Sequence, residues 1–203
     1  MLFSLLFATL PVYPSQTLTT NPSAGVSSPR VNTYSSIPHE NHRTEKVTYE
    51  VKFGFIGAGE LTIEKKDSTV VVKGKSGGMV GWFYHYKLYM VYNLKNPSSS
   101  YMKEVENKKR RYYDFKRILK KKPWLPVVVQ LLLSSEGKNP PEVLKVGNLT
   151  VRLAERRGND WLFIVEGSKK VKWVILRGWV PGKFPEEIEI SGKDGTLTLV
   201  REG

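Results

Sequence analysis

The sequence predicts a mainly β protein, built as a single curved antiparallel sheet or half-open barrel with at most one short helix. Apolar and polar residues alternate with a period of two over most of the chain after Val47, which is typical of strands that bury one face. Turn signals rich in Gly, Asn, Asp and Ser recur at intervals of about 8–12 residues. Many short strands separated in this way favour a sandwich, a barrel or a strongly curved sheet.

The 203 residues divide into three parts. Residues 1–14 are predicted to be a signal peptide for export, because Leu2 to Val12 form an uncharged apolar stretch of suitable length. The basic residues that precede such a stretch in signal peptides are absent, so an apolar leader without a sorting role is the alternative. Pro11 interrupts the stretch, and no transmembrane span is expected.

Residues 15–46 are predicted to be a flexible Ser/Thr/Pro/Asn-rich tether, because they contain too few large apolar side chains to bury. His39 and His42 lie in this tether and are interpreted as solvated loop residues, since no fixed backbone holds them as metal ligands. Residues 47–203 are predicted to form the antiparallel β domain. A domain of this size buries roughly 70% of its unfolded surface, and the absence of Cys excludes disulfide and thiol chemistry.

The first half of the domain is predicted to form successive strands. Val47 to Phe55 alternate in polarity, and the Gly57-Ala58-Gly59 step that follows indicates a bend or a bulge. Further strands are expected at 61–63, 69–72 and 82–92, and two more between 101 and 119 around a turn near 107–109.

Residues 124–133 are apolar on all sides, unlike the alternating segments around them. Pro123 and Pro126 suit the first turn of a helix, which predicts one short buried helix. The β-branched run from Val127 to Val129 fits a buried strand almost as well, so both alternatives stay open. After this segment, strands are expected at 149–153, 161–165, 171–176, 188–190 and 197–199.

The formal net charge of +13 favours a polyanionic partner, which can be nucleic acid, anionic lipid or acidic polysaccharide. Between Lys103 and Lys122, ten Lys or Arg residues face three Asp or Glu residues and are interleaved with Tyr and Phe. This block is predicted to bind anions, with cations on phosphates and rings for stacking. The alternative is a solvated sheet face or an edge strand protected from aggregation by lysine. The predicted anion-binding residues are Lys108, Lys109, Arg110, Arg111, Lys116 and Arg117.

The aromatic segment at 82–92 is a candidate lining for an apolar pocket, because curved antiparallel sheets often enclose ligands on their concave side. The alternative is an ordinary packed core with tyrosine hydroxyls at its boundary. The predicted apolar-ligand residues are Trp82, Tyr84, Tyr86 and Tyr92.

No enzymatic constellation is evident, and the protein is predicted not to be an enzyme. His85 is the only histidine within the domain, and its neighbours on the same strand face, Phe83 and Lys87, do not complete a triad. Glu187 and Glu189 share a strand face and are interpreted as solvated. No catalytic residue, metal site or cofactor is predicted.

Several features occur in an order that resembles the bacterial family called domain of unknown function 3108. The resemblance covers about residues 46–201 and implies an exported, mostly antiparallel β domain of the cell envelope without an assigned activity or catalytic residues. The segments that carry it are Tyr49-Glu50-Val51, Gly57-Ala58-Gly59-Glu60-Leu61, Trp82-Phe83-Tyr84 and Pro181-Gly182-Lys183-Phe184-Pro185.

These observations lead to a functional hypothesis. The protein is expected to be a non-enzymatic binding or scaffold protein of the periplasm or cell envelope. It is expected either to contact an anionic surface, such as anionic lipid, lipopolysaccharide or a cell-wall polymer, or to carry an apolar ligand in the concavity of its sheet. The alternative is a cytosolic nucleic-acid-binding β domain that uses the same basic block at 103–122.

Overall fold

A computed structural model describes residues 44–133 and 138–203. The predicted signal peptide at 1–14 lies outside the described residues, as does the predicted tether at 15–46 apart from residues 44–46. Glu45 and Lys46 open the first strand, so the β domain begins two residues before the predicted boundary at Val47.

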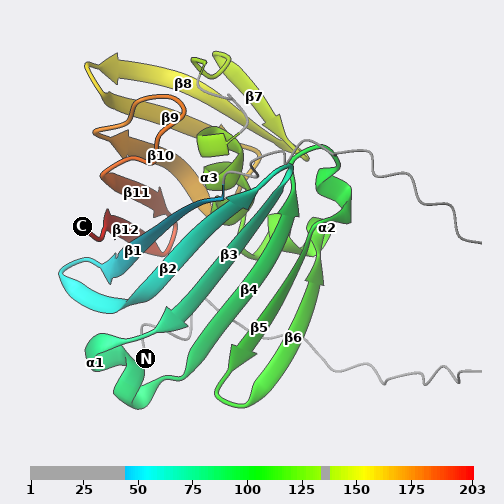
Figure 1. Cartoon of the computed structure of the whole chain (residues 1–203), viewed down its shortest axis with the longest axis vertical. Helices are drawn as coiled ribbons and strands as arrows, with labels where there is room; N and C mark the ends of the chain where they lie inside the picture. The colour runs from blue at the N-terminus through cyan, green and yellow to red at the C-terminus, as the bar shows by residue number, and fades with distance from the viewer. Residues whose placement is uncertain (1–43, 134–137) are drawn as a thin grey trace, which may run out of the picture. The chain divides into compact units, whose positions relative to one another are not determined.

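Within the described residues, twelve antiparallel strands form one sheet, which confirms the predicted mainly β fold (Figure 1). The spatial order is β6-β5-β4-β3-β2-β1-β12-β11-β10-β9-β8-β7, so two meanders of six strands are joined by the pairing of β1 with β12. The edge strands β6 and β7 do not pair with each other, and the sheet is therefore open. The strands are β1 (Glu45–Phe53), β2 (Ile56–Lys66), β3 (Thr69–Ser76), β4 (Tyr86–Asn93), β5 (Tyr101–Glu106), β6 (Lys109–Asp114), β7 (Val143–Val146), β8 (Leu149–Arg157), β9 (Asp160–Glu166), β10 (Val171–Arg177), β11 (Glu187–Gly192) and β12 (Gly195–Arg201).

The predicted alternation places one apolar row across each meander. In the first, register partners on neighbouring strands are all buried, because every second residue of a strand faces the same side. This row consists of Val47, Ile63, Val72, Met90 and Met102. The second meander carries an equivalent buried row of Leu199, Ile188, Leu176 and Trp161.

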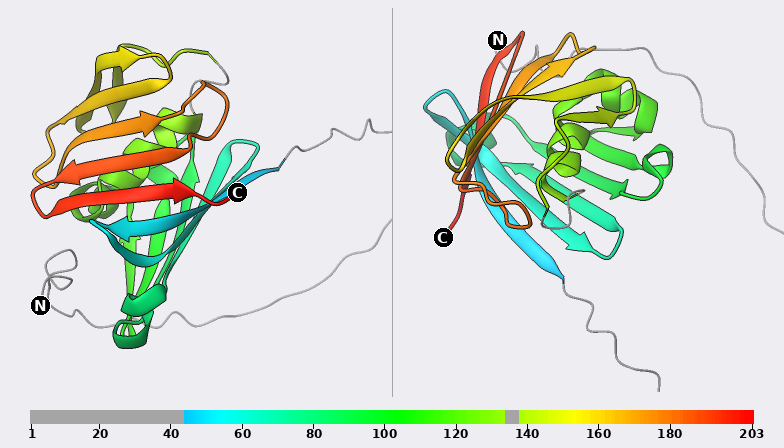
Figure 2. Two further views of the ribbon diagram at one scale, coloured as in Figure 1. Left: turned by 90° about the vertical axis from the view of Figure 1, so that its left-hand side faces the viewer. Right: turned by 90° about the horizontal axis from the view of Figure 1, so that it is seen from above.

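The apolar segment at 124–133 is the helix α3 (Trp124–Leu133), which settles the alternative that the sequence left open. It lies inside the curve of the sheet (Figures 1 and 2), and eight of its ten residues are buried. A helix that is apolar all round must be covered on all sides, which the concave sheet and α2 (Phe115–Lys121) accomplish. Its one polar residue, Gln130, accepts a 2.9 Å hydrogen bond from the Tyr92 hydroxyl. The described residues contain no helix with the length and apolar character needed to cross a bilayer.

Two further α-helices replace segments that were expected to be strands, whereas at most one short helix was predicted. Trp82 and Phe83 belong to α1 (Gly78–Phe83), and the aromatic strand begins only at Tyr86. The second half of the predicted 101–119 strand pair ends at Asp114, whose carboxylate caps α2 by accepting a hydrogen bond from the Arg117 amide at 2.8 Å. A cap of this kind starts a helix wherever the following residues can bury one side of it. A short 3₁₀ turn, η2 (Pro97–Ser99), connects β4 to β5.

We expect Gly59→Ala to destabilise the protein more than Gly158→Ala. Both glycines have positive φ angles, +151° and +60°, so both substitutions carry backbone strain of about 1–2 kcal/mol. An added Cβ at Gly59 would also lie 2.0 Å from the carbonyl oxygen of Lys75, whereas nothing lies within 4 Å at Gly158. Urea unfolding should therefore show a loss about 1–3 kcal/mol larger for Gly59→Ala. Equal losses for the two variants would contradict the close packing of β2 against β3.

Candidate functional site

A group of polar side chains gathers where β4, β5 and β6 meet the C-terminal end of α2. Its two members on β5, Glu104 and Glu106, lie on the same strand face as the core residue Met102. Charged groups therefore occur on a face that is otherwise apolar. We call this group the polar cluster. It consists of Tyr84, Tyr86, Glu104, Glu106, Arg111, Tyr113 and Lys122.

Arg111 joins the two carboxylates of the polar cluster. Its Nη1 donates to Glu104 Oε1 at 3.3 Å and also to Glu106 Oε2. The Tyr84 hydroxyl donates to the other oxygen of Glu106 at 2.7 Å. Lys122 approaches the other oxygen of Glu104: its Nζ lies 3.7 Å from Glu104 Oε2 and 5.0 Å from the centre of the Tyr86 ring. The cluster is therefore one connected network of ion pairs, hydrogen bonds and a cation–π contact.

The charged groups at the centre of the network are almost completely buried. Glu104 is 2% exposed and Lys122 is 7% exposed. Among the described atoms, Glu104 Oε2 has no hydrogen-bond partner and only the longer ion pair with Lys122. Burying two charges costs more than a moderate ion pair returns, so a pair of this kind is weak evidence for a stabilising role. A buried, strongly perturbed cluster is instead a candidate functional site.

Burial dominates the protonation behaviour of the cluster. It lowers the pKa of Lys122 to about 8, while Glu104 opposes this effect and the cation of Lys170 adds to it. Burial alone would raise the pKa of Glu106, but hydrogen bonds from Tyr84 and Arg111 outweigh it and the pKa is lowered. Burial also raises the pKa of Tyr84. At neutral pH the cluster therefore holds an ionised Glu106 carboxylate, a protonated Tyr84 and a lysine that releases its proton in mildly alkaline solution.

A second charged feature lies on α2 beside the polar cluster. We call it the cation cluster, and it consists of Arg117, Lys120, Lys121 and Lys170. Burial lowers the pKa of Lys121, and repulsion from Lys170, Lys120, Arg111 and Arg117 lowers it further. Lys170 comes from the β9–β10 turn, so the cation cluster combines residues that are about 50 positions apart in the sequence.

Close packing explains how the β9–β10 turn approaches α2. A Cβ added at Gly147 in the β7–β8 turn would lie 2.3 Å from Leu119 Cδ1 of α2. One added at Gly167 in the β9–β10 turn would lie 3.1 Å from the carbonyl oxygen of Asn148. The two turns and the helix are thus stacked directly on one another. Only glycine, with its positive φ at both turn positions, permits this approach.

A third feature is an exposed apolar surface, which we call the hairpin end (residues 54–57, 77–85 and 107–109). The Gly77 amide donates to Ala58 O at 3.1 Å, and the Asn107 amide donates to His85 O at 2.9 Å. The connections β1–β2, β3–β4 and β5–β6 therefore lie side by side at one end of the first meander (Figure 1). Four large apolar side chains project from it, Phe55 (96% exposed), Met79 (71%), Trp82 (84%) and Phe83 (84%).

The structure distributes the six predicted anion-binding residues over three places. Lys108, Lys109 and Arg110 are exposed at or next to the β5–β6 turn of the hairpin end. Arg111 turns inward and belongs to the polar cluster. Lys116 and Arg117 are exposed on the first turn of α2, separated from Lys109 by the length of β6, about 17 Å.

The four predicted apolar-ligand residues are also separated. Trp82 is exposed at the hairpin end, whereas Tyr92 is buried in the core against α3. Tyr84 and Tyr86 stack on each other with ring centres 6.2 Å apart and belong to the polar cluster. These residues therefore do not line one common cavity.

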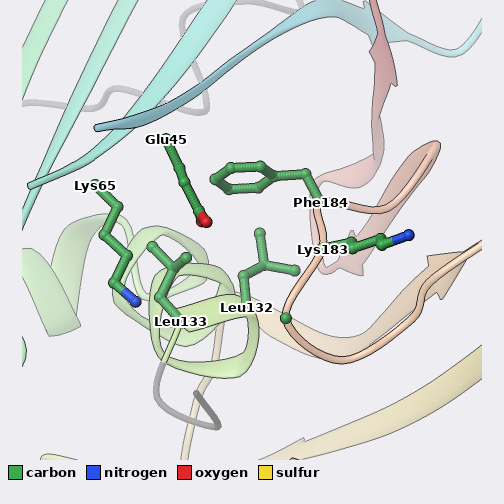
Figure 3. A pocket seen from close by; sticks show the side chains of 7 residues that line it. Glu45, Lys65, Leu132, Leu133, Lys183 and Phe184 are labelled. Carbon is green, nitrogen blue, oxygen red and sulfur yellow. The ribbon is translucent and has the colours of Figure 1, made fainter. Parts of the chain in front are cut away.

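An open pocket of about 390 Å³ lies at the C-terminal end of α3 (Figure 3). Leu132, Leu133 and Phe184 supply its apolar surface, and the Glu45 carboxylate points between them. Lys65 adds a charge at the rim. This pocket lies next to α3 and can receive a small molecule, whereas the predicted apolar-ligand residues of 82–92 do not line it.

The loop that walls this pocket is held rigidly by hydrogen bonds. Trp179 Nε1 donates to Lys183 O at 3.0 Å, and the Tyr49 hydroxyl donates to Pro185 O at 3.1 Å. Between them, Arg201 Nη1 donates to Phe184 O at 3.0 Å. Three consecutive carbonyls are therefore each fixed by a side chain, so this side of the pocket is pre-formed.

The residues considered for catalysis or metal binding do not assemble into such a site within the described part of the chain. His85 is exposed, and its amide donates to Asn107 Oδ1 at 2.9 Å as part of the hairpin end. Glu187 and Glu189 both bind Arg177, at 3.1 and 2.9 Å. No group of three or more His, Asp or Glu side chains in residues 44–133 and 138–203 could hold a metal ion. His39 and His42 lie outside the described residues.

Sequence reasoning missed Glu104, Glu106, Lys121, Lys122 and Lys170. One signal was available for the carboxylates, because Met102, Glu104 and Glu106 share a strand parity and the first is a core residue type. Lys121 and Lys122 directly precede the apolar helix in the sequence, and nothing in the sequence indicates that Lys122 is buried. Lys170 joins the site only through the packing of the turns, which a single sequence does not reveal.

The fold and these sites define a class of protein: an open antiparallel β sheet wrapped around an apolar helix, with a basic and aromatic exterior. No family model matches the chain. It is 32% identical over 145 residues to an uncharacterised protein of Aquifex aeolicus (strain VF5), which covers 71% of this chain and 78% of the relative. The chain therefore belongs to the same family as that protein. The resemblance to domain of unknown function 3108 stays a prediction.

We expect the stability of the wild-type protein to rise between about pH 8 and pH 10 because of Lys122. The folded-state pKa of about 8 lies below the unfolded value of 10.5, so the unfolded chain binds more protons in this window and the free energy of unfolding increases with pH. The full difference corresponds to about 3 kcal/mol. Above pH 10 the buried tyrosines reverse the trend, because their raised pKa values, about 12 for Tyr92, keep them protonated only in the folded state.

Lys122→Met should remove the alkaline increase in urea unfolding measured at intervals from pH 7 to 10, while the decline above pH 10 persists. Lys172→Met, which removes an exposed strand lysine, is the matched control and should leave the wild-type slope unchanged. The same slope in Lys122→Met as in wild type would show that Lys122 is not the buried titrating group.

Proposed function

We propose that this domain is a non-enzymatic peripheral protein that docks on anionic lipid surfaces through the hairpin end. The observation that carries the proposal is the set of four large apolar side chains exposed on two adjacent connections, next to the lysines of the β5–β6 turn. The cell envelope or periplasm is the location that this function and the predicted export segment together favour.

The exposed apolar side chains of the hairpin end are clustered. Single exposed hydrophobic residues are common on protein surfaces and need no explanation. Here Phe55 lies on the β1–β2 connection and the other three lie on α1, and a Cβ added at Gly78 would lie 3.2 Å from the carbonyl oxygen of Gly57, so all four exposed side chains come from two adjacent connections. Trp and Phe are residues that favour the interface of a bilayer. Burying one such side chain contributes roughly 1.5–3 kcal/mol, so two or three suffice for reversible docking.

The charge at the hairpin end complements an anionic surface. Lys108 and Lys109 lie in the turn that is hydrogen-bonded to His85, directly after α1. Neither of them forms an ion pair with a carboxylate of the described residues, and the same is true of Lys87 and Arg110 nearby. Each cation near an anionic membrane contributes roughly 1 kcal/mol. Apolar insertion and electrostatic attraction therefore act at the same end of the domain.

We expect Trp82→Ala combined with Phe83→Ala to weaken binding to vesicles of phosphatidylglycerol and phosphatidylcholine at least tenfold. Tyr112→Ala is the matched control, because Tyr112 is a comparably exposed aromatic residue (58%) on β6 outside the hairpin end. It should bind like wild type in co-sedimentation. Equal binding by all three proteins would contradict docking through the hairpin end.

Reversing the charge at Lys108 and Lys109 to Glu should lower affinity for the same vesicles on the order of tenfold or more, and the loss should shrink in high salt. Reversal of Lys66 and Lys95, exposed at the opposite strand ends, makes the same change in net charge and should have little effect. A parallel titration with duplex DNA tests the nucleic-acid alternative. Tighter, steeply salt-dependent DNA binding that survives Trp82→Ala would favour that alternative instead.

Carriage of a small apolar ligand is a second candidate function, supported by the pocket beside Leu132, Leu133 and Phe184. Its pre-formed wall and its volume of about 390 Å³ suit a ligand with one short apolar chain. Native mass spectrometry of protein purified from its own host should then detect a retained small molecule. Leu132→Trp, which fills the pocket, should lose that molecule, and a wild-type protein that carries nothing would remove this candidate.

A further inference from the structure

The cation cluster on α2 has a surplus of positive charge that the described residues do not neutralise. Within the described part of the chain, no carboxylate forms an ion pair with Arg117, Lys120, Lys121 or Lys170. Of the carboxylates near α2, Asp114 caps the helix at the Arg117 amide, and Glu104 and Glu106 are both bound by Arg111. The charge that remains on this side of the domain is therefore positive.

The backbone holds these cations in place. Asp114 caps α2 at the Arg117 amide, and Leu119 packs against Gly147 on the helix side that faces the sheet. In the β9–β10 turn, Ser168 Oγ accepts hydrogen bonds from the amides of Lys170 and Val171 at 3.1 and 3.0 Å. The backbone positions of these lysines are therefore fixed on two different elements. A pre-organised site has this property, whereas a flexible basic tail does not.

Lys121 lies at the surface, and the next residue, Lys122, lies in the interior. Lys122 is buried against Glu104 and the Tyr86 ring, and Lys121 before it is only partly exposed. Lys170 is close enough to repel both of them. Like charges at a partly buried position repel one another, and an anion bound between them offsets that repulsion.

We propose that Lys121 and Lys170, with Arg117 and Lys120, form a binding site for a phosphate group. Phosphate is favoured over a carboxylate because its two negative charges offset the repulsion among several lysines at once. The site lies on α2 and the β9–β10 turn, outside the hairpin end, and does not depend on docking there. Inorganic phosphate and the phosphate of a lipid head group share this chemistry, and the experiment below distinguishes them.

The test is a titration of the full chain at pH 7, followed by ¹H–¹⁵N NMR, with inorganic phosphate in one arm and dihexanoyl phosphatidic acid below its micelle concentration in the other. Saturable shifts are expected at the amides of Lys121, Lys122 and Lys170. Lys121→Gln combined with Lys170→Gln should weaken binding at least tenfold. Lys73→Gln combined with Lys75→Gln removes the same charge from the exposed face of β3, away from α2, and should bind like wild type.

A second readout separates binding from a merely structural effect. Phosphate should raise the pKa of Lys121 in wild type, because the anion removes the repulsion that lowers it. Saturable binding that requires Lys121 and Lys170 supports the site. Tighter binding of phosphatidic acid than of inorganic phosphate would identify the ligand as a lipid head group. The absence of saturable shifts in both arms, or equal weakening in the Lys73 and Lys75 control, would overturn it. Vesicle docking through Trp82 can succeed or fail independently of this result.

Discussion

The burial of α3 inside the curved sheet is the interaction on which the rest of the structure depends. The two meanders are joined only through β1 and β12, and their outer edges, β6 and β7, do not pair. The chain between those edges supplies α2 and α3, and eight of the ten α3 residues are buried. Each large aliphatic side chain buried in this way contributes roughly 1.5–3 kcal/mol. The helix therefore provides the apolar centre around which both halves of the open sheet pack.

This arrangement determines where partners can bind. Because α3 is buried in the concavity of the sheet, the pocket near Leu132 and Phe184 opens at the C-terminal end of this helix. The same connection places α2 at the edge of the sheet, where Lys122 reaches the polar cluster and the other α2 cations face outward. The meander topology gathers the β1–β2, β3–β4 and β5–β6 connections at one end, which concentrates the exposed aromatic residues there. The proposed lipid-docking and phosphate sites thus follow from the sheet order.

The period-two pattern was sufficient to predict a curved antiparallel sheet, because it reports directly which strand face is buried. It was insufficient at Trp82 and at Phe115, where short helices replace the expected strands. A six- or seven-residue helix has too few turns to show a clear period, and its start depends on local features such as the Asp114 cap. The apolar segment at 124–133 was ambiguous for the same physical reason, since a fully buried helix and a fully buried strand have the same composition.

The candidate sites were less predictable than the fold. The basic block was visible, but Arg111 turns inward because Glu104 is its register partner on β5, and pairing register cannot be deduced from composition. Lys170 joins α2 only because Gly147 and Gly167 allow two turns to pack closely. Trp82 was predicted to contact an apolar ligand in a cavity, yet the structure places it, exposed, on the connection between β3 and β4. Side chains brought together by tertiary packing carry no local sequence signal.

Hydrogen–deuterium exchange of the full chain, with and without anionic vesicles, tests the central claim most directly. We expect slower exchange on lipid at residues 54–57, 77–85 and 107–109, with unchanged, strong protection throughout α3. Faster exchange in α3 would mean that the helix leaves the concavity and that the interior of the sheet receives the lipid. That result, or protection confined to segments outside the hairpin end, would contradict the account.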